Sequence, residues 1–149
     1  MAPNSIQLHL LAAGRDEVLS ERVQLIPEIS GNAGLQQTLL RALLEREQLH
    51  RTGIGGGVAL PHARSALVGI VDHPVIVFGR HRRGISFGLI DGEPARLFFL
   101  LVAPTVTAHL EILARVSRVL HEARFRQDLL MAETGDRVMQ LIRTAEEKF

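Results

Sequence analysis

A single histidine, His62, ends a glycine-rich stretch in a setting suited to phosphoryl chemistry. The run from Thr52 to Arg64 reads Thr-Gly-Ile-Gly-Gly-Gly-Val-Ala-Leu-Pro-His-Ala-Arg, so a flexible turn, a brief strand and a stiff proline precede the imidazole. A neutral imidazole nitrogen is a nucleophile near neutral pH. Backbone N–H groups and the guanidinium of Arg64 can stabilise the negative charge of a transferring phosphoryl group. The pattern indicates a phosphoryl acceptor, with a purely structural turn as the alternative and an ordinary surface role as the alternative for Arg64.

Two other uses of this histidine are disfavoured by the surrounding residues. The glycine run is not a nucleotide-binding P-loop, because no Lys-Ser or Lys-Thr pair follows the glycines. A zinc site shared by His62 and His109 lacks support, since no His-x-x-x-His spacing or paired glutamate supplies further ligands. The chain also has no cysteine. We therefore expect no metal and no other cofactor.

Two further polar residues interrupt the apolar faces of predicted helices. Arg46 lies three residues after Leu43, on or beside the leucine stripe of a helix expected over residues 35–48. His109 lies on the apolar stripe of a helix expected over residues 107–123, in its first turn. Free backbone N–H groups and the helix dipole favour an anion at that position. From spacing alone, a snorkelling arginine and a hydrogen-bonded structural histidine are the alternatives.

The remaining pattern predicts a layered α/β domain with a mixed sheet. Helical periodicity dominates both ends of the chain, and short apolar runs punctuated by glycine and proline fill the middle. The predicted elements are a helix over residues 5–26 broken near Gly14, a loop over 27–34, a helix over 35–48, strands over 74–78, 85–87 and 96–103, a turn at Asp91-Gly92, and helices over 107–123, 124–133 and 136–147.

Composition excludes several classes of function. The 149 residues, 46% of them hydrophobic, fit one domain, and a net charge of +1 without Trp or Tyr does not favour nucleic acid as a partner. The longest apolar run, 97–104, is far shorter than the roughly 20 residues that span a bilayer. With no signal-like N-terminus, we expect a cytoplasmic protein without membrane insertion. The basic run from Arg80 to Arg83 predicts a solvated hairpin turn, with docking to an acidic partner as an open alternative.

The segment 52–64 resembles the signature of type-2 EIIA domains of the bacterial phosphotransferase system, the fructose, mannitol and nitrogen-regulatory group. Similar motifs occur in consistent order over about residues 38–145. They comprise Leu44-Glu45-Arg46-Glu47, Gly84-Ile85-Ser86-Phe87, Asp91-Gly92, the strand ending in Ala103-Pro104, and His109-Leu110. Residues 1–34 do not show the family's usual opening of strand and helix. The expectation is one domain over 1–149, with a divergent segment over 1–34 and a recognisable core over 35–149.

The resemblance implies a fold and a set of roles. The fold is a three-layer α/β/α sandwich with a mixed sheet. His62 matches the histidine that accepts a phosphoryl group from a phosphohistidine of HPr or its nitrogen-branch counterpart. Arg46 and His109 match the arginine and second histidine that flank the phosphorylated ring. Thr52 and the backbone of Gly53, Gly55 and Gly57 would shape the phosphoryl cradle, with Arg64 in support.

Three uses of this chemistry remain open at the level of sequence. The chain begins with Met and shows no attached EIIB, which favours the free-standing nitrogen-regulatory branch, where phosphorylation is a switch toward a regulated target protein. The first alternative is a sugar-specific relay to an EIIB-like acceptor of a fructose- or mannitol-type transporter. The second is a partner-binding module that is not phosphorylated.

Overall fold

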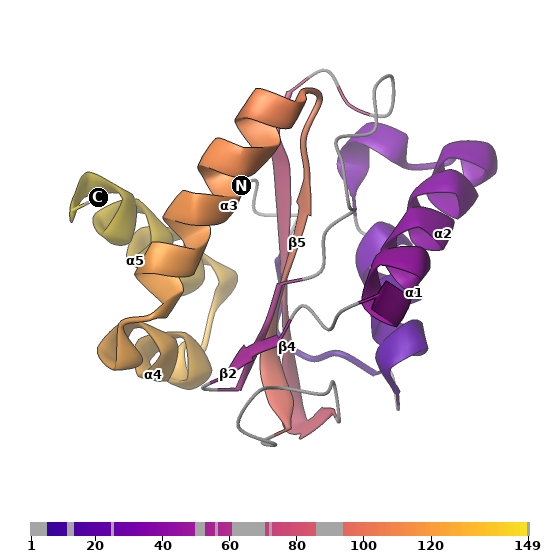
Figure 1. Cartoon of the computed structure of the whole chain (residues 1–149). Helices are drawn as coiled ribbons and strands as arrows, with labels where there is room; N and C mark the ends of the chain where they lie inside the picture. The colour runs from indigo at the N-terminus through magenta and orange to yellow at the C-terminus, as the bar shows by residue number, and fades with distance from the viewer. Residues whose placement is uncertain are drawn as a thin grey trace.

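In the computed structural model of the chain, a five-stranded mixed sheet lies between two layers of helices (Figure 1). The structure describes residues 6–11, 14–24, 26–49, 53–55, 57–60, 71, 73–85 and 94–148. β4 and β5 form the antiparallel centre, β1 joins β4 in parallel, β3 joins β5 in parallel, and β2 is antiparallel to β3. The strand order is β1 (Ile6–Gln7), β4 (Val75–Ile85), β5 (Ala95–Val102), β3 (Val58–Ala59), β2 (Gly53–Gly55).

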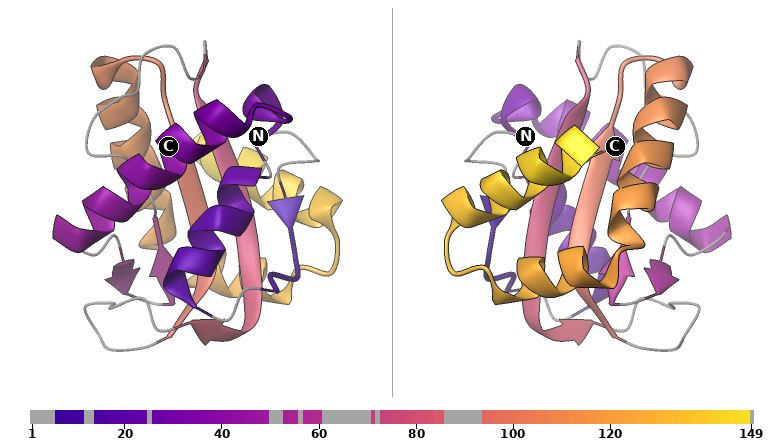
Figure 2. Two further views of the ribbon diagram at one scale, coloured as in Figure 1. Left: turned by 90° about the vertical axis from the view of Figure 1, so that its right-hand side faces the viewer. Right: turned by 90° about the vertical axis from the view of Figure 1, so that its left-hand side faces the viewer.

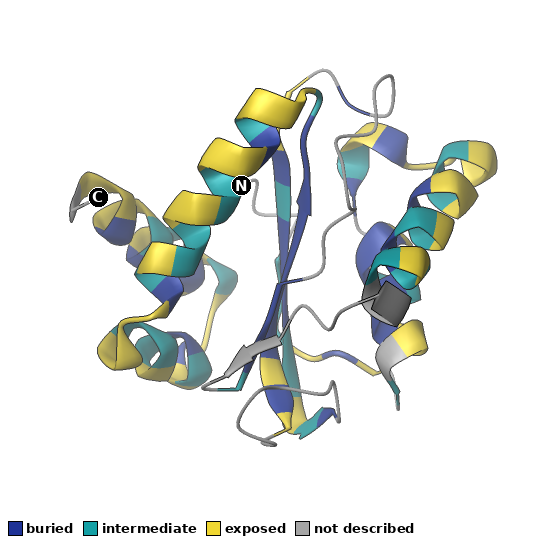
Figure 3. Ribbon diagram, viewed as in Figure 1, coloured by how far each residue is buried: buried dark blue, intermediate teal, exposed yellow. Residues whose placement is uncertain are grey.

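The two helical layers cover opposite faces of this sheet, as the two side views show (Figure 2). Along β5, Phe98 and Leu100 pack toward one layer, whereas Leu97 and Phe99 pack toward the other. A strand buried on both faces has to be apolar throughout, which explains the continuous hydrophobic run of β5 (Figure 3). One layer holds α1 (Arg15–Gln24), the 3-10 helix η2 (Pro27–Ile29) and α2 (Ala33–Leu49); the other holds α3 (Val106–Leu120), α4 (Ala123–Met131) and α5 (Gly135–Lys148). The predicted three-layer α/β/α sandwich is confirmed.

The N-terminal segment differs from the sequence-based expectation. Instead of a helix, β1 runs beside β4, with Ile6 opposite Phe78 and Gln7 opposite Gly79. Helix α1 begins directly after Gly14, so the break and the helix that follows it were predicted correctly, whereas the part before Gly14 was not. Residues 27–34 were expected to be a loop, yet they contain η2 and the start of α2. The α2 start is fixed by Asn32, whose Oδ1 accepts a hydrogen bond from Leu35 N at 3.1 Å.

The basic run of residues 80–83 lies within β4, so the prediction of a hairpin turn there is wrong. The strand continues to Ile85 because Arg80 pairs opposite Leu97 and finds partners for its side chain. Its Nη1 donates to the carbonyl oxygens of Leu129 and Ala132 at the end of α4, at 3.1 and 2.5 Å. A cation at a helix C-terminus offsets the exposed carbonyl dipoles there. The expected turn at 91–92 and the strand residues 86–87 lie outside the described residues.

A buried arginine joins α1 to the sheet, and sequence reasoning did not identify it. The side chain of Arg22 is fully buried; its Nη1 donates to Phe78 O at 2.7 Å and its Nη2 donates to Gln7 Oε1. Desolvation lowers the pKa of Arg22 to about 10, which leaves the guanidinium charged at neutral pH. Gly79 provides the space: a Cβ there would lie 2.9 Å from Arg22 Cζ.

Candidate functional site

The glycine-rich segment forms a tight connection between β2 and β3. Gly53 pairs with Ala59 and Gly55 pairs with Val58, with an irregular register between the two pairs. Gly57 has a φ of 77°, a left-handed conformation that favours a residue without Cβ. Its carbonyl oxygen accepts hydrogen bonds from Arg96 N at 2.8 Å and Leu97 N at 3.0 Å. The turn is thereby anchored to the start of β5.

Strand β3 leads the chain from this turn toward the end of the sheet where α3 begins. β3 runs parallel to β5, with Ala59 opposite Phe98, and β5 is followed by α3. Leu60, the last described residue before His62, is 2% exposed and belongs to the apolar cluster that includes Leu113 of α3. The described segment that contains β3 ends at Leu60, two positions before the predicted phosphoryl acceptor.

His109 lies in the first turn of α3, as the apolar stripe predicted. Thr105 caps this helix: its Oγ1 accepts a hydrogen bond from Ala108 N at 3.2 Å, and its carbonyl oxygen accepts one from His109 N at 3.0 Å. The His109 side chain is buried, at 4% exposure, and this desolvation lowers its pKa below the usual 6.5. A neutral imidazole offers one N–H donor and one acceptor nitrogen near neutral pH.

Arg46 approaches from the other helical layer. It lies in the last turn of α2 and is half-buried, one turn beyond the buried Leu43. Figure 2 shows the C-terminal end of α2 and the helix α3 on opposite faces, both on the β3–β2 side of the sheet. The C-terminal end of α2, the β2–β3 pair and α3 thus lie toward the same edge of the sheet, in different layers. The glycine turn lies at the start of β5, whereas His109 follows the end of that strand.

Three of the predicted site residues, Thr52, His62 and Arg64, lie outside the described residues, so their positions stay predictions. Thr105 was not among the predicted site residues, although a threonine directly after Pro104 and before an apolar stripe is a typical N-cap signal. Within the described ranges, no three His, Cys, Asp or Glu side chains are placed to hold a metal ion. None of the described helices is both long and apolar enough to cross a bilayer.

The sequence of residues 1–145 matches the family model of the phosphoenolpyruvate-dependent sugar phosphotransferase system, EIIA 2. The chain belongs to this family. The match confirms the resemblance stated from the motifs around residues 52–64, and it includes the N-terminal segment as well.

Individual relatives of this EIIA chain carry two kinds of name. The chain is 34% identical over 144 residues to the fructose-specific EIIABC component of Bacillus subtilis, a match that covers 95% of this chain but only 22% of that protein. It is 29% identical over 144 residues to the nitrogen regulatory protein of Bradyrhizobium diazoefficiens, covering 95% and 91% of the two chains. The crystal structure of IIA-Ntr from Neisseria meningitidis superposes with a TM-score of 0.83 at 26% identity, covering 95% and 94% of the two chains.

Proposed function

We propose that this EIIA chain is a phosphocarrier whose His62 accepts a phosphoryl group from the phosphohistidine of an HPr-like donor. In this step the N–P bond of the donor breaks and a new N–P bond to a His62 ring nitrogen forms. The His62 ring loses its N–H proton and the donor imidazole takes up one proton, so the donor leaves as a neutral ring. Family membership supports the chemistry. The observation that carries its assignment to this region is the course of β3 from the glycine turn toward the buried His109.

The distances along the chain agree with this assignment. His62 is two positions after Leu60, and two residues span at most about 7 Å. Leu60 packs in the same cluster as Leu113, and His109 precedes Leu113 by four residues, or about 6 Å along α3. These separations along the chain support the proposal that His62 and His109 belong to one site.

The proposed roles follow from the chemistry of each group. Neutral His109 would donate its N–H to a phosphoryl oxygen, and Arg46 would supply positive charge from the opposite layer. Thr52 and the backbone of the glycine segment, Gly53, Gly55 and Gly57, would line the cradle, with Arg64 in support. Each contact stabilises the negative charge that arrives with the phosphoryl group.

Two fates of the phosphoryl group have support among the relatives. A nitrogen regulatory relative aligned over 91% of its length favours a switch, in which roughly two added negative charges change which target protein binds. The second candidate is a relay to an EIIB-like acceptor, favoured by 34% identity to a fructose-specific component whose name combines A, B and C. The cytoplasmic location expected from the sequence is part of both proposals.

Intact-mass spectrometry tests the common step. The chain is incubated with Enzyme I, an HPr-type donor and phosphoenolpyruvate, alongside His62→Ala and a control, His9→Ala, which changes an exposed histidine near β1. We expect one acid-labile phosphoryl group on the wild type and the control and none on His62→Ala. Absence of the group from the wild type with several donors would leave only the unphosphorylated binding module.

A second incubation separates the two fates. Phosphorylated chain, freed of donor, is mixed with an EIIB domain of the fructose or mannitol type. Loss of the phosphoryl group from this chain with an equal gain on EIIB supports the relay. Retention of the group, together with a phosphorylation-dependent change in affinity for a target protein, supports the switch.

A further inference from the structure

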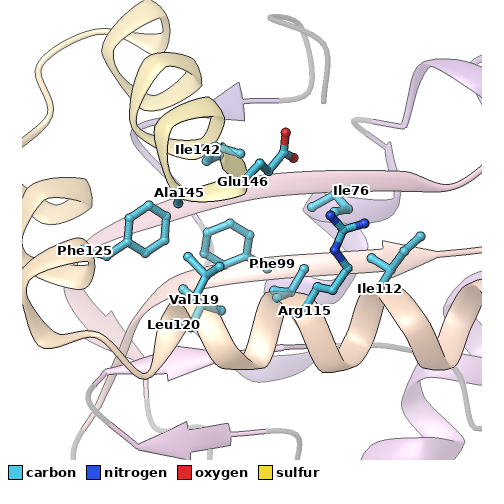
Figure 4. A pocket seen from close by; sticks show the side chains of 11 residues that line it. Ile76, Phe99, Ile112, Arg115, Val119, Leu120, Phe125, Ile142, Ala145 and Glu146 are labelled. Atoms are coloured by element: carbon cyan, nitrogen blue, oxygen red, sulfur yellow. The ribbon is translucent and has the colours of Figure 1, made fainter. Parts of the chain in front are cut away.

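A largely apolar pocket of about 300 Å³ opens between α3, α5 and the sheet (Figure 4). Phe99 of β5 and Phe125 of α4 contribute aromatic rings, and Ile112 of α3 and Ile142 of α5 contribute aliphatic walls. His109 is not among the lining residues. The volume is at the lower end of the range typical of small-molecule sites, which are concave and mostly apolar with a few polar groups.

The polar groups of this pocket are two side chains of opposite charge. Arg115 reaches into it from α3 and Glu146 from α5, and Figure 4 shows both toward the end of the pocket where Ile76 lies, away from Phe125. Both residues are exposed, so their charges stay in contact with water. Neither forms an ion pair with another residue in the described part of the chain. With respect to the described residues, the apolar pocket therefore carries one unpaired cation and one unpaired anion at the same end.

We propose that this pocket binds a free apolar α-amino acid, with phenylalanine or leucine as the representative ligand. Its carboxylate would pair with the Arg115 guanidinium, its ammonium with the Glu146 carboxylate, and its side chain would lie among Phe99, Phe125 and Ile142. A fatty acid or aromatic acid would satisfy Arg115 but place an anion beside Glu146. An apolar amine would reverse the problem. Only a ligand that carries both charges next to an apolar body matches all three features.

Methyl NMR titration with L-phenylalanine tests the proposal directly, independently of whether His62 is phosphorylated. The reporters are the methyl groups of Ile112 and Ile142, and the control reporter is Ile29, which is buried on the α1–α2 side of the sheet. We expect saturable shifts of the first two and none of the third, with a dissociation constant at or below about 1 mM. If neither L-phenylalanine nor L-leucine causes saturable shifts at concentrations up to about 10 mM, the proposal is overturned.

Charge recognition is tested with variants whose side chains are exposed, so that the fold is retained. Arg115→Gln and Glu146→Gln are compared with Arg118→Gln and Glu147→Gln, which change like residues outside the pocket. We expect each pocket variant to weaken L-phenylalanine binding at least about tenfold and each control variant to leave it unchanged.

Ligand analogues give the complementary comparison on the wild-type chain. 3-Phenylpropionate lacks the ammonium group, 2-phenylethylamine lacks the carboxylate, and glycine lacks the apolar body. Each is expected to bind at least about tenfold more weakly than L-phenylalanine. Equal binding of either aromatic analogue, or equal binding by the pocket variants, would show that apolar contact alone fills the pocket and would overturn recognition of an amino acid.

Discussion

His109 combines a titratable ring with an almost completely buried position, and the combination has a cost at low pH. Burial disfavours the charged imidazolium, so the pKa of His109 in the folded chain lies below its usual value. Near neutral pH the ring is uncharged and carries one N–H donor. A dianionic phosphoryl group near the ring would favour the charged imidazolium and would therefore act against this lowering of the pKa.

Stability should therefore fall on acidification, and His109 should account for part of the loss. Below the usual histidine pKa of about 6.5, the unfolded chain binds a proton at this residue that the folded chain resists. The free energy of unfolding then decreases as the pH falls from 7 toward the lowered pKa of His109. Urea titrations between pH 5 and pH 8 should show a shallower decrease for His109→Gln. The control His9→Gln, at an exposed position, should show the same decrease in unfolding free energy as the wild type. If His109→Gln shows that decrease too, burial of His109 does not account for the loss of stability at low pH.

The contact between Arg22 and Gly79 gives a second prediction for a single residue. Gly79→Ala places a Cβ 2.9 Å from Arg22 Cζ, within a guanidinium held by hydrogen bonds to Phe78 and Gln7. We expect a loss of about 1–3 kcal/mol in the free energy of unfolding, measured by urea denaturation. Gly34→Ala is the control, because its Cβ makes only an ordinary contact, and we expect it to be neutral or stabilising by up to about 1 kcal/mol. Equal effects of both substitutions would contradict the close packing.

Residues with a local signal could be identified from the sequence, whereas residues whose contacts are distant along the chain could not. Arg46 and His109 were identified because each breaks the periodicity of its own helix, which is a local signal. Arg22 and Gly79 are 57 positions apart, and nothing near either one indicates the other. His62 was singled out by its glycine and proline neighbours, but its position in the structure stays a prediction.

At the scale of elements, the first turn of α3 is held by its cap. Thr105 Oγ1 accepts a hydrogen bond from Ala108 N, and His109 follows on the same turn. Thr105→Ala should lower the free energy of unfolding by about 0.5–2 kcal/mol in urea denaturation. Thr107 is exposed and is the second residue of α3, so Thr107→Ala is the matched control. It should lower the free energy of unfolding by less than Thr105→Ala does.

The same cap should matter for the position of His109. If Thr105→Ala loosens the first turn, phosphorylation of His62 should slow in the variant while Thr107→Ala retains the wild-type rate. Unchanged stability and rate in Thr105→Ala would show that the turn is fixed by packing of the rest of α3.

Elements with sustained periodicity were predicted well, and the brief strand before Pro61 corresponds to β3, whereas β1 was not predicted. The helices over 35–48, 107–123, 124–133 and 136–147 match α2 to α5 to within a few residues, because each buries a long apolar stripe. β1 has two residues, too few for any alternation, and its pairing with β4 depends on residues about 70 positions away. The basic second half of β4 has the local sequence of a turn. The carbonyl groups at the end of α4 that bind the Arg80 side chain are about 50 positions away, so the local sequence does not reveal them.

At the scale of the whole molecule, the layered architecture follows from the order of elements, but the strand order does not. The sequence predicted helices around a mixed sheet. It did not predict that β3 and β2 extend the sheet beyond β5, since two- and three-residue strands carry little signal of their own. That extension bears on the proposed site, because β3 runs parallel to β5 toward the end of the sheet where α3 begins.

The outer face of α3 next to His109 is the surface where we expect the phosphoryl donor to dock. Val106 and Leu110 stand four residues apart on the helix, 57% and 60% exposed, beside the buried His109. Exposed apolar side chains beside the proposed site would stabilise a bound partner whose own active residue has to reach that site. Leu110→Asp should therefore raise the KM for the HPr-type donor at least about fivefold, with little change in kcat or stability.

Met131→Asp is the matched control, since Met131 is 69% exposed at the end of α4. It places the same charge on an equally exposed apolar position outside the docking face. Initial rates of phosphorylation measured over a range of donor concentrations distinguish the two variants. If Leu110→Asp and Met131→Asp change KM alike, the added charge acts through the overall field of the protein, and the donor docks elsewhere. If only Leu110→Asp raises KM, the helix that carries His109 also presents the surface on which the donor of the phosphoryl group docks.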